Sequence, residues 1–335
     1  MRAPGLGPRK GSAARTVLKV GLSGALLAWL LSRAGLGSIA GVIGGARPAW
    51  LVAAVVLGIG ATAVQTTQWR SLLAALGLWR AWLRCLRLVY VGYAFNTVLP
   101  SAVGGDVVRA IAVAERPEER GAAATSVVLQ RLCNFPGMML LMTVGLLATL
   151  GDPNAGRVRI AAVATTLLGA GIIAVAVSPL PGLLAEHRLL SGRGRPLAGV
   201  LRRIDAFRSH RRQMAMASLR GTTFWSISVV NQWCLMRGVG IEASLGYAAV
   251  VVTTVNIMTL LPISLNGYGV REGGFSAFLA INGLASTSQA LAMSLLLAAQ
   301  TLLWGAAGIL CWLAPSAVMG SAIRRTAAPR LEANA

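Results

Sequence analysis

Two stretches of the sequence decide the fold. The first reads Asn96-Thr-Val-Leu-Pro100-Ser-Ala-Val-Gly104-Gly105-Asp106-Val-Val-Arg109, and the second reads Asn256-Ile-Met-Thr-Leu-Leu-Pro262-Ile-Ser-Leu-Asn266-Gly267-Tyr-Gly269-Val-Arg271-Glu272. In both, an asparagine precedes a Leu-Pro pair, and an arginine follows the proline by nine residues. Proline and glycine interrupt helices and leave backbone N–H and C=O groups without partners inside the helix. Each stretch therefore predicts a break between two short helices.

Long apolar runs surround both breaks. Hydrophobic residues make up 56% of the 335 residues and charged residues 12%, with a mean hydropathy of +0.68, whereas soluble domains carry about 25% charged residues. Apolar runs that approach the ~20 residues of a membrane-crossing helix recur along the chain. This composition excludes a soluble globular enzyme and a protein anchored by one span. We predict an all-α polytopic membrane protein with about six full spans, at 20–32, 50–68, 121–150, 160–177, 221–236 and 291–313.

Basic residues predict how the chain is oriented. They cluster in the N-terminal tail, at 70–87, at 181–213 and in the C-terminal tail. Cytoplasmic segments of membrane proteins are enriched in Lys and Arg. To place all four clusters on that side, the short apolar runs at 90–99 and 245–262 must each return to the side from which they start. They can do so as re-entrant hairpins or as paired full crossings.

We favour two re-entrant hairpins that are broken by Pro and Gly and open to opposite sides of the membrane. Two oppositely oriented copies of one pattern are typical of inverted repeats in transporters. The predicted organisation is a single transmembrane domain over 20–313, with repeat elements at 90–120 and 245–285, a basic cytoplasmic loop at 181–213, and cytoplasmic tails at 1–19 and 314–335. We expect a multi-pass protein of the plasma membrane with both termini in the cytoplasm.

The excess of basic charge points to lipid rather than to nucleic acid. The chain has 31 Lys and Arg against 10 Asp and Glu, a formal net charge of +21. The basic residues lie mainly between apolar runs, where they set topology and contact anionic lipid headgroups. We expect such contacts at 181–213 and no nucleic-acid partner. Both histidines lie in that segment, and the four cysteines form no Cys-x-x-Cys pair, so we predict no metal site and no cofactor.

Ionisable residues at or beside the breaks carry the candidate chemistry. Each charge placed at the centre of a membrane costs about 3 kcal/mol, so such groups must pair, face water or hold a charged ligand. Arginine suits phosphate through its planar donor fork, and helix N-termini favour anions. The predicted substrate-binding residues are Asn96, Asp106, Arg109, Arg131, Asn256, Arg271 and Glu272. The predicted hairpin-forming residues are Pro100, Gly104, Gly105, Pro262, Gly267, Gly269 and Gly273.

Structural interpretations of the same residues stay open at this point. The pairs Asp106–Arg109 and Arg271–Glu272 could be local ion pairs that pin the hairpins. Arg131, ten residues into the span at 121–150, could be a structural partner of Asp106 or of Glu272. Several amide side chains could line a cavity or only join helices. They are Gln65, Gln68, Gln130, Asn134, Asn231 and Gln232.

These motifs resemble the lysylphosphatidylglycerol synthase transmembrane family, a flippase-like domain. The family pattern is Asn-x3-Pro, then Gly-Gly-Asp-x2-Arg, an Arg on the following helix and a late Gly-x-Arg-Glu-Gly element. The matching residues are Asn96, Pro100, Gly104, Gly105, Asp106, Arg109, Arg131, Gly269, Arg271, Glu272 and Gly273, and the resemblance covers roughly residues 18–315. An acid often precedes the helix Arg in the family, whereas this chain has Gln130.

The resemblance implies the transport half of the family's activity. In bifunctional members, a soluble C-terminal domain transfers the aminoacyl group to lipid. The sequence shows no such domain after Leu313, so we do not expect this chain to be an enzyme that makes lysyl-phosphatidylglycerol. We expect it to move a phosphate-bearing membrane phospholipid, or a polyprenyl-phosphate-linked glycan, between leaflets.

Two other functions fit the sequence. One is an integral-membrane lipid-linked glycosyl or acyl transferase in which Asp106 or Glu272 acts as general base. The other is a non-catalytic membrane subunit that binds a membrane enzyme through the segment 181–213.

Overall fold

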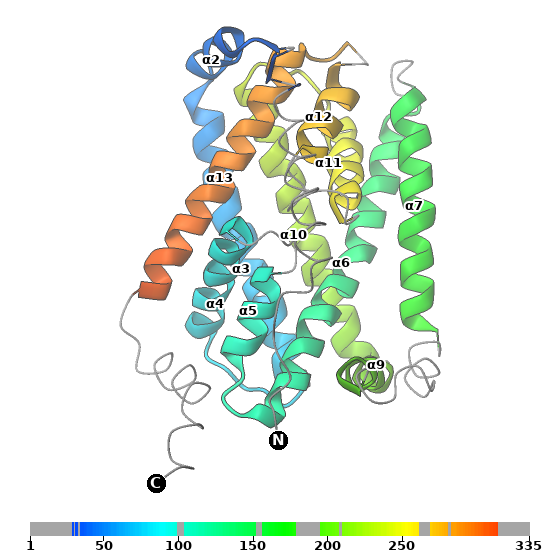
Figure 1. Cartoon of the computed structure of the whole chain (residues 1–335). Helices are drawn as coiled ribbons and strands as arrows, with labels where there is room; N and C mark the ends of the chain where they lie inside the picture. Colours follow the sequence, from blue (N-terminus) through cyan, green and yellow to red (C-terminus); the bar gives the residue numbers. More distant parts are fainter. Residues whose placement is uncertain are drawn as a thin grey trace, which may run out of the picture.

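The protein is all-helical in the part of the chain that the structure describes. The computed structural model describes residues 29, 31–32, 34–98, 104–151, 156–178, 195–207, 210–260, 269–280 and 283–313. The elements are α2 (Leu36–Gly44), α3 (Pro48–Ala75), α4 (Trp82–Val98), α5 (Gly104–Val113), the 3₁₀ turn η1 (Pro117–Glu119), α6 (Arg120–Ala148), α7 (Gly156–Val177), α9 (Arg195–Phe207), α10 (Arg211–Gly238), α11 (Leu245–Leu260), α12 (Val270–Ala280) and α13 (Thr287–Leu313) (Figure 1). The predicted all-α class is confirmed.

Among the residues that the structure describes, three helical segments are long and apolar enough to cross a membrane. They are Pro48–Ala75, Pro117–Ala148 and Thr287–Leu313, and they contain or closely match the predicted spans at 50–68, 121–150 and 291–313. The predicted spans at 160–177 and 221–236 lie within α7 and α10. Most of the span predicted at 20–32 lies outside the described residues.

Both predicted basic segments, 70–87 and 181–213, contain helices. Helix α3 continues past Arg70, and α4 begins at Trp82, so only residues 76–81 of the basic cluster at 70–87 lie between helices. Arginine is a good helix former, and the guanidinium of Arg87 is satisfied within the fold because its Nε donates to the carbonyl of Cys311 (2.7 Å).

The segment predicted as a loop at 181–213 contains α9 and the start of α10. Helix α9 is amphipathic, and its Ala198 and Ile204 are buried. Ile204 packs with Leu129 and Cys133 of α6. This apolar stripe, rather than the charge run, determines the local structure.

The first break joins two antiparallel helices, α4 and α5, which we call hairpin one. We call the end of a hairpin where the chain enters and leaves its mouth. At the mouth of hairpin one, the Nε of Arg80 donates to the carbonyl of Val113 (3.1 Å), and Arg84 pairs with Glu115. Hairpin one therefore begins and ends at the same end of the molecule. With ten residues at 1.5 Å each, α5 is about 15 Å long, half of a typical hydrocarbon core.

The second break joins α11 and α12, which we call hairpin two. Its mouth is closed by Tyr247 near the start of α11, whose hydroxyl donates to the carbonyl of Phe278 near the end of α12 (2.6 Å). Hairpin two occupies the opposite end of the molecule from hairpin one (Figure 1). The opposite arrangement is what the inverted repeat requires, and the symmetry itself stays a prediction.

Arginines of the described residues gather at the end where hairpin one has its mouth. There α3 and α13 end, α4, α6 and α10 begin, and α9 packs on α6 (Figure 1). The arginines of this end are Arg70, Arg80, Arg84, Arg87, Arg116, Arg120, Arg202, Arg203, Arg211 and Arg212. The described parts of two predicted cytoplasmic clusters, 70–87 and 181–213, thus lie on one side.

At the mouth of hairpin one, the buried side chain of Arg80 binds residues on the far side of the hairpin, an arrangement that we call the clamp. Its contribution to stability can be tested. The side chain of Arg80 is 9% exposed and pairs with Glu119 (2.5 Å), whose Oε2 also accepts the N–H of Glu115 (2.7 Å). We expect Arg80→Ala to lower the free energy of unfolding by about 2 kcal/mol, because a carbonyl and a carboxylate lose their donor. Thermal unfolding in detergent measures this, with the exposed Arg116→Ala as control. Equal unfolding temperatures for the two variants would show that the clamp contributes nothing.

The clamp also has a pH dependence. The hydrogen bond from Arg84 lowers the pKa of Glu115, and the nearby charge of Arg80 acts in the same direction. Because this carboxyl has a lowered pKa in the folded state, its stabilising effect is present above its ordinary pKa and is lost as the pH falls through the lowered value. The effect is small because Glu115 is half exposed.

Candidate functional site

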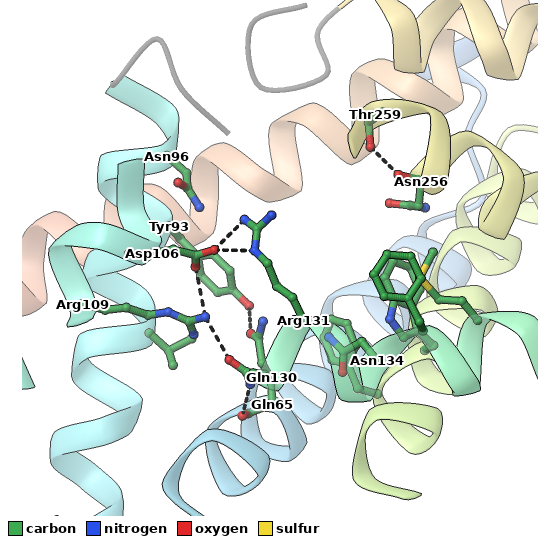
Figure 2. A pocket seen from close by; sticks show the side chains of 16 residues that line it. Gln65, Tyr93, Asn96, Asp106, Arg109, Gln130, Arg131, Asn134, Asn256 and Thr259 are labelled. Atoms are coloured by element: carbon green, nitrogen blue, oxygen red, sulfur yellow. Dashed lines mark hydrogen bonds and ion pairs between the residues drawn. The ribbon is translucent and has the colours of Figure 1, made fainter. Parts of the chain in front are cut away.

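A cavity of about 530 Å³ lies between the inner part of hairpin one and the inner end of α11 (Figure 2). Six helices, α3, α4, α5, α6, α10 and α11, contribute its lining. Polar lining residues are Gln65, Tyr93, Asn96, Asp106, Arg109, Gln130, Arg131, Asn134, Asn256 and Thr259, and aromatic ones are Phe135, Phe224 and Trp225. The lining of the cavity combines a charged cluster with neutral polar and aromatic residues.

The charged cluster of the cavity is centred on Asp106, which bridges two arginines. Asp106 lies in the first turn of α5. Its Oδ1 pairs with Arg109 one turn later (3.0 Å), and its Oδ2 accepts from both Nη2 and Nε of Arg131 on α6 (2.5 and 2.8 Å) (Figure 2). The Arg131 pairing that the sequence offered as an alternative is thus formed with Asp106.

The two arginines differ in how deeply they are held. The side chain of Arg109 is only 6% exposed and lies over the ring of Trp69, with 4.9 Å from Cζ to the ring centroid. It also donates to Oε1 of Gln130 (2.9 Å). Arg131 is 41% exposed, so its guanidinium can reach a molecule in the cavity. Arg109 instead orients Asp106.

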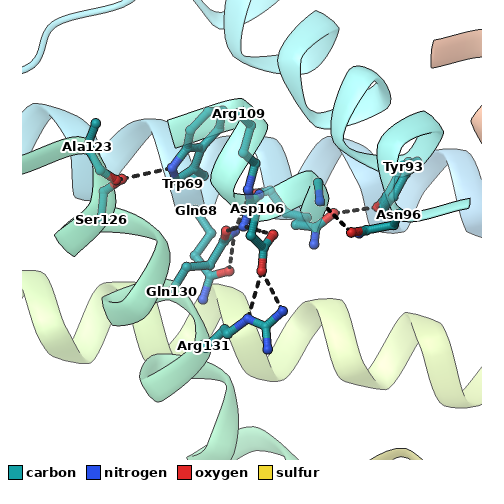
Figure 3. A network of polar contacts seen from close by, with 12 residues as sticks. Gln68, Trp69, Tyr93, Asn96, Asp106, Arg109, Ala123, Ser126, Gln130 and Arg131 are labelled. Atoms are coloured by element: carbon teal, nitrogen blue, oxygen red, sulfur yellow. Dashed lines mark hydrogen bonds and ion pairs between the residues drawn. The ribbon is translucent and has the colours of Figure 1, made fainter. Parts of the chain in front are cut away.

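Amide side chains form a chain of hydrogen bonds behind this centre (Figure 3). Gln130 donates to Gln65 O (3.0 Å) and Gln68 Oε1 (3.1 Å), and Gln68 donates to Asn134 Oδ1 (2.9 Å) and Ala217 O (3.0 Å). Gln68 and Gln130 therefore join α3, α6 and α10, while Gln65, Gln130 and Asn134 also line the cavity. Gln130, which stands where the resemblance implies an acid before the helix arginine, belongs to this amide junction.

The asparagines of the two breaks lie on opposite sides of the cavity (Figure 2). Asn96 Oδ1 accepts the backbone N–H of Gly105 (2.7 Å) and so ties the end of α4 to the first turn of α5. Asn256 donates to the carbonyl of Val252 (2.7 Å) on its own helix, α11. One asparagine stabilises its hairpin, and the other presents its amide oxygen to the cavity.

Arg271 and Glu272 are not among the residues that line the cavity. Glu272 is buried, and its two oxygens accept from Arg271 (3.0 Å) and from the backbone N–H of Gly269 (2.6 Å). Gly269 has a φ of +82°, a conformation that favours glycine. The structure thus brings together five of the seven predicted site residues and places this pair at the start of α12.

The predicted hairpin-forming residues fall into two groups. Gly104 and Gly105 begin α5, Gly269 precedes α12, and Gly273 lies within α12. Pro100, Pro262 and Gly267 lie outside the described residues.

The buried pair in hairpin two gives a stability prediction. We expect Glu272→Ala to lower the free energy of unfolding by about 3 kcal/mol, because Arg271 loses its carboxylate partner at a buried position. Thermal unfolding in detergent measures the change. Glu272→Gln is the matched control, since an amide oxygen can still accept from Gly269. Its unfolding temperature should lie between those of the unmodified protein and Glu272→Ala. An unchanged midpoint for Glu272→Ala would contradict the pinning role.

Sequence reasoning missed the wall residues Tyr93, Phe135, Phe224, Trp225 and Thr259. Tyr93 donates to Gln65 Oε1 (2.5 Å) and lies one helical turn before Asn96, a spacing that could have revealed it. The aromatic residues of α6 and α10 give no such signal, because apolar side chains on membrane helices equally face lipid.

Comparison with known proteins shows the family of the chain. A family model described as the lysylphosphatidylglycerol synthase TM region matches residues 16–313. The chain belongs to this family. The suspected resemblance is thereby confirmed, and the lysylphosphatidylglycerol synthase transmembrane family, together with the apolar helices, makes the chain a membrane protein.

A curated relative is the glycosyltransferase AglD of Haloferax volcanii, which is 26% identical to this family member over 294 residues. The match covers 76% of this chain and 47% of the relative, so the chain spans about half the length of the relative.

Proposed function

We propose that this protein moves a phosphate-bearing lipid, or a polyprenyl-phosphate-linked glycan, between the leaflets of a membrane. The observation that carries the proposal is the half-exposed guanidinium of Arg131 at the cavity, held in place by Asp106. A fixed planar donor fork is suited to a phosphate group. The membership of the chain in a lipid-related membrane family supports the same reading.

The hairpins support a route for the headgroup. The cavity lies at the inner part of hairpin one and the inner end of α11, and the two hairpins have their mouths at opposite ends. A headgroup in the cavity would therefore be separated from either membrane surface by only one short hairpin. Acyl chains can stay in lipid while the headgroup crosses, which avoids the cost of bringing a bare charge through the hydrocarbon core.

The ion pair with Asp106 limits how tightly the phosphate is bound. A lone arginine in the cavity would hold an anion strongly, whereas Asp106 competes with the ligand for the same guanidinium. Transport requires binding that is favourable enough for entry and weak enough for exit. We further propose that the arginine-rich end faces the cytoplasm at the plasma membrane, where its arginines contact anionic headgroups.

Reconstitution tests the proposal directly. The purified full chain is placed in liposomes that carry headgroup-labelled phosphatidylglycerol in both leaflets, and a membrane-impermeant quencher is added outside. We expect inner-leaflet label to become accessible faster than in protein-free liposomes. Equal rates, with the protein shown to be folded in the same vesicles, would contradict movement of this class of lipid.

A transferase is the second candidate, because a relative is named as a glycosyltransferase. The geometry disfavours Asp106 as a general base, since both of its oxygens are engaged by arginines. Glu272 is similarly occupied by Arg271 and Gly269. Incubation with a labelled polyprenyl-phosphate sugar and an acceptor lipid distinguishes the two: a glycosylated product supports the transferase, and label that changes leaflet without a product supports transport.

A further inference from the structure

The charge of the cavity narrows the class of headgroup. Among its lining residues, Asp106, Arg109 and Arg131 carry formal charge, and two guanidinium groups with one carboxylate leave one positive charge in excess. The chain segments that join the hairpin helices, 99–103 and 261–268, contain no acidic or basic residue. A ligand with one negative charge would balance the site, whereas a diphosphate would leave further charge uncompensated at membrane depth.

The carboxylates near the breaks leave no place for a positively charged headgroup. Asp106 uses Oδ1 for Arg109 and Oδ2 for Arg131. Glu272 uses its two oxygens for Arg271 and Gly269 and does not line the cavity. An ammonium group brought into the cavity would meet an excess of positive charge and would have to displace an arginine from Asp106 to obtain a carboxylate partner.

The neutral wall instead offers hydrogen bonds to hydroxyl groups. The side-chain oxygens of Gln65 and Asn134 accept hydrogen bonds from Tyr93 and Gln68. Within the described part of the chain, their side-chain nitrogens, Gln65 Nε2 and Asn134 Nδ2, are donors with no partner. Asn256 uses only its Nδ2, so its Oδ1 is a free acceptor. The cavity thus combines free amide donors, a free amide acceptor and the aromatic rings of Phe224 and Trp225 in its lining. This combination matches a polyhydroxyl group.

We propose that the ligand is a lipid with a single phosphate and an uncharged, hydroxylated headgroup, such as a glycerol, an inositol or a sugar, and that an aminoacylated headgroup is rejected. Arg131 binds the phosphate, and Gln65, Asn134 and Asn256 bind the hydroxyl groups. This assignment rests on the proposed function, because it takes the cavity to be the headgroup site.

The test compares lipids that share the same acyl chains. Phosphatidylinositol, phosphatidylglycerol and lysyl-phosphatidylglycerol are titrated in mixed micelles into the purified full chain, and binding is followed as a concentration-dependent rise in unfolding temperature. We expect the first two to bind at least about tenfold more tightly than the lysyl lipid, the factor that corresponds to one well-made charged or polar contact. Equal or tighter binding of lysyl-phosphatidylglycerol would overturn the assignment.

Two variants locate the preference in the cavity. Asn134→Asp keeps the oxygen that accepts from Gln68 and adds a carboxylate, so we expect it to narrow or reverse the discrimination against the lysyl lipid. Asn256→Leu removes a hydrogen-bonding group and should weaken phosphatidylinositol more than the lysyl lipid. Unchanged selectivity in both folded variants would place recognition of the headgroup outside this cavity.

The liposome assay separates the proposed function from the headgroup assignment. Selective binding without transport contradicts the proposed function alone, and transport without selectivity contradicts the headgroup assignment alone.

Discussion

Transport of phosphatidylglycerol is expected to fall about 10- to 100-fold when Arg131 is replaced by alanine, the range that follows from losing one hydrogen-bonded charge contact of about 1.5–3 kcal/mol. Arg131 is the exposed arginine of the Asp106 cluster, so the loss acts on ligand binding. Asp106 keeps its bond to Arg109 (3.0 Å), and the fold should survive. The measurement is the initial rate of headgroup exposure in reconstituted liposomes.

Two further variants make the Arg131 result specific. Arg131→Lys keeps the charge but not the planar fork, so it should transport at an intermediate rate. Arg237→Ala is the control, because it also removes an arginine from the helical bundle, but Arg237 packs on the ring of Trp233 (5.2 Å) and does not line the cavity. It should transport like the unmodified protein. Normal transport by a folded Arg131→Ala variant would contradict the proposal that Arg131 binds the phosphate.

Gly105→Ala is expected to prevent hairpin one from forming. A Cβ atom at this position would lie 1.9 Å from the backbone oxygen of Gly92 on α4 and 2.7 Å from Oδ1 of Asn96. The first obstacle is backbone, so relief requires α4 and α5 to separate. We expect a loss of about 4 kcal/mol or more, at the extreme of single substitutions, seen as little monodisperse protein after detergent extraction.

A glycine of hairpin two provides the matched control. A Cβ atom at Gly273 would meet no atom within 4 Å, and alanine favours a helix by about 1 kcal/mol over glycine. Gly273→Ala should therefore be extracted in normal yield and unfold at the same or a higher temperature. If Gly105→Ala were as stable as Gly273→Ala, the close approach of α4 and α5 would not be part of the working structure.

The positions of the breaks and of the buried charges could be predicted because they depend on local chemistry. Proline and glycine interrupt helices wherever they occur, and a charge in an apolar run needs a partner or water in any fold. This reasoning found Asp106, Arg109, Arg131, Asn96 and Asn256, all of which line one cavity.

The choice of partners could not be predicted, because it depends on packing between distant helices. Arg131 had two candidate carboxylates, and the sequence carries no information on which one lies within 3 Å. The prediction that Arg271 and Glu272 bind substrate with the others has no support from the cavity, which they do not line. Likewise, the close approach of the α4 and α5 backbones at Gly92 and Gly105 cannot be predicted from the sequence, because it depends on how the two helices pack.

Helix α13 is synthesised last among the described elements, yet it packs against α4 of hairpin one as well as against α12. Its Gly308 lies against the carbonyl of Tyr90, and its Gly305 against Thr97. During translation, hairpin one therefore leaves the ribosome long before the helix that covers it. Until α13 arrives, the uncovered face of α4 must be shielded by lipid or by the insertion machinery, so late truncations should expose nascent hairpin one to degradation.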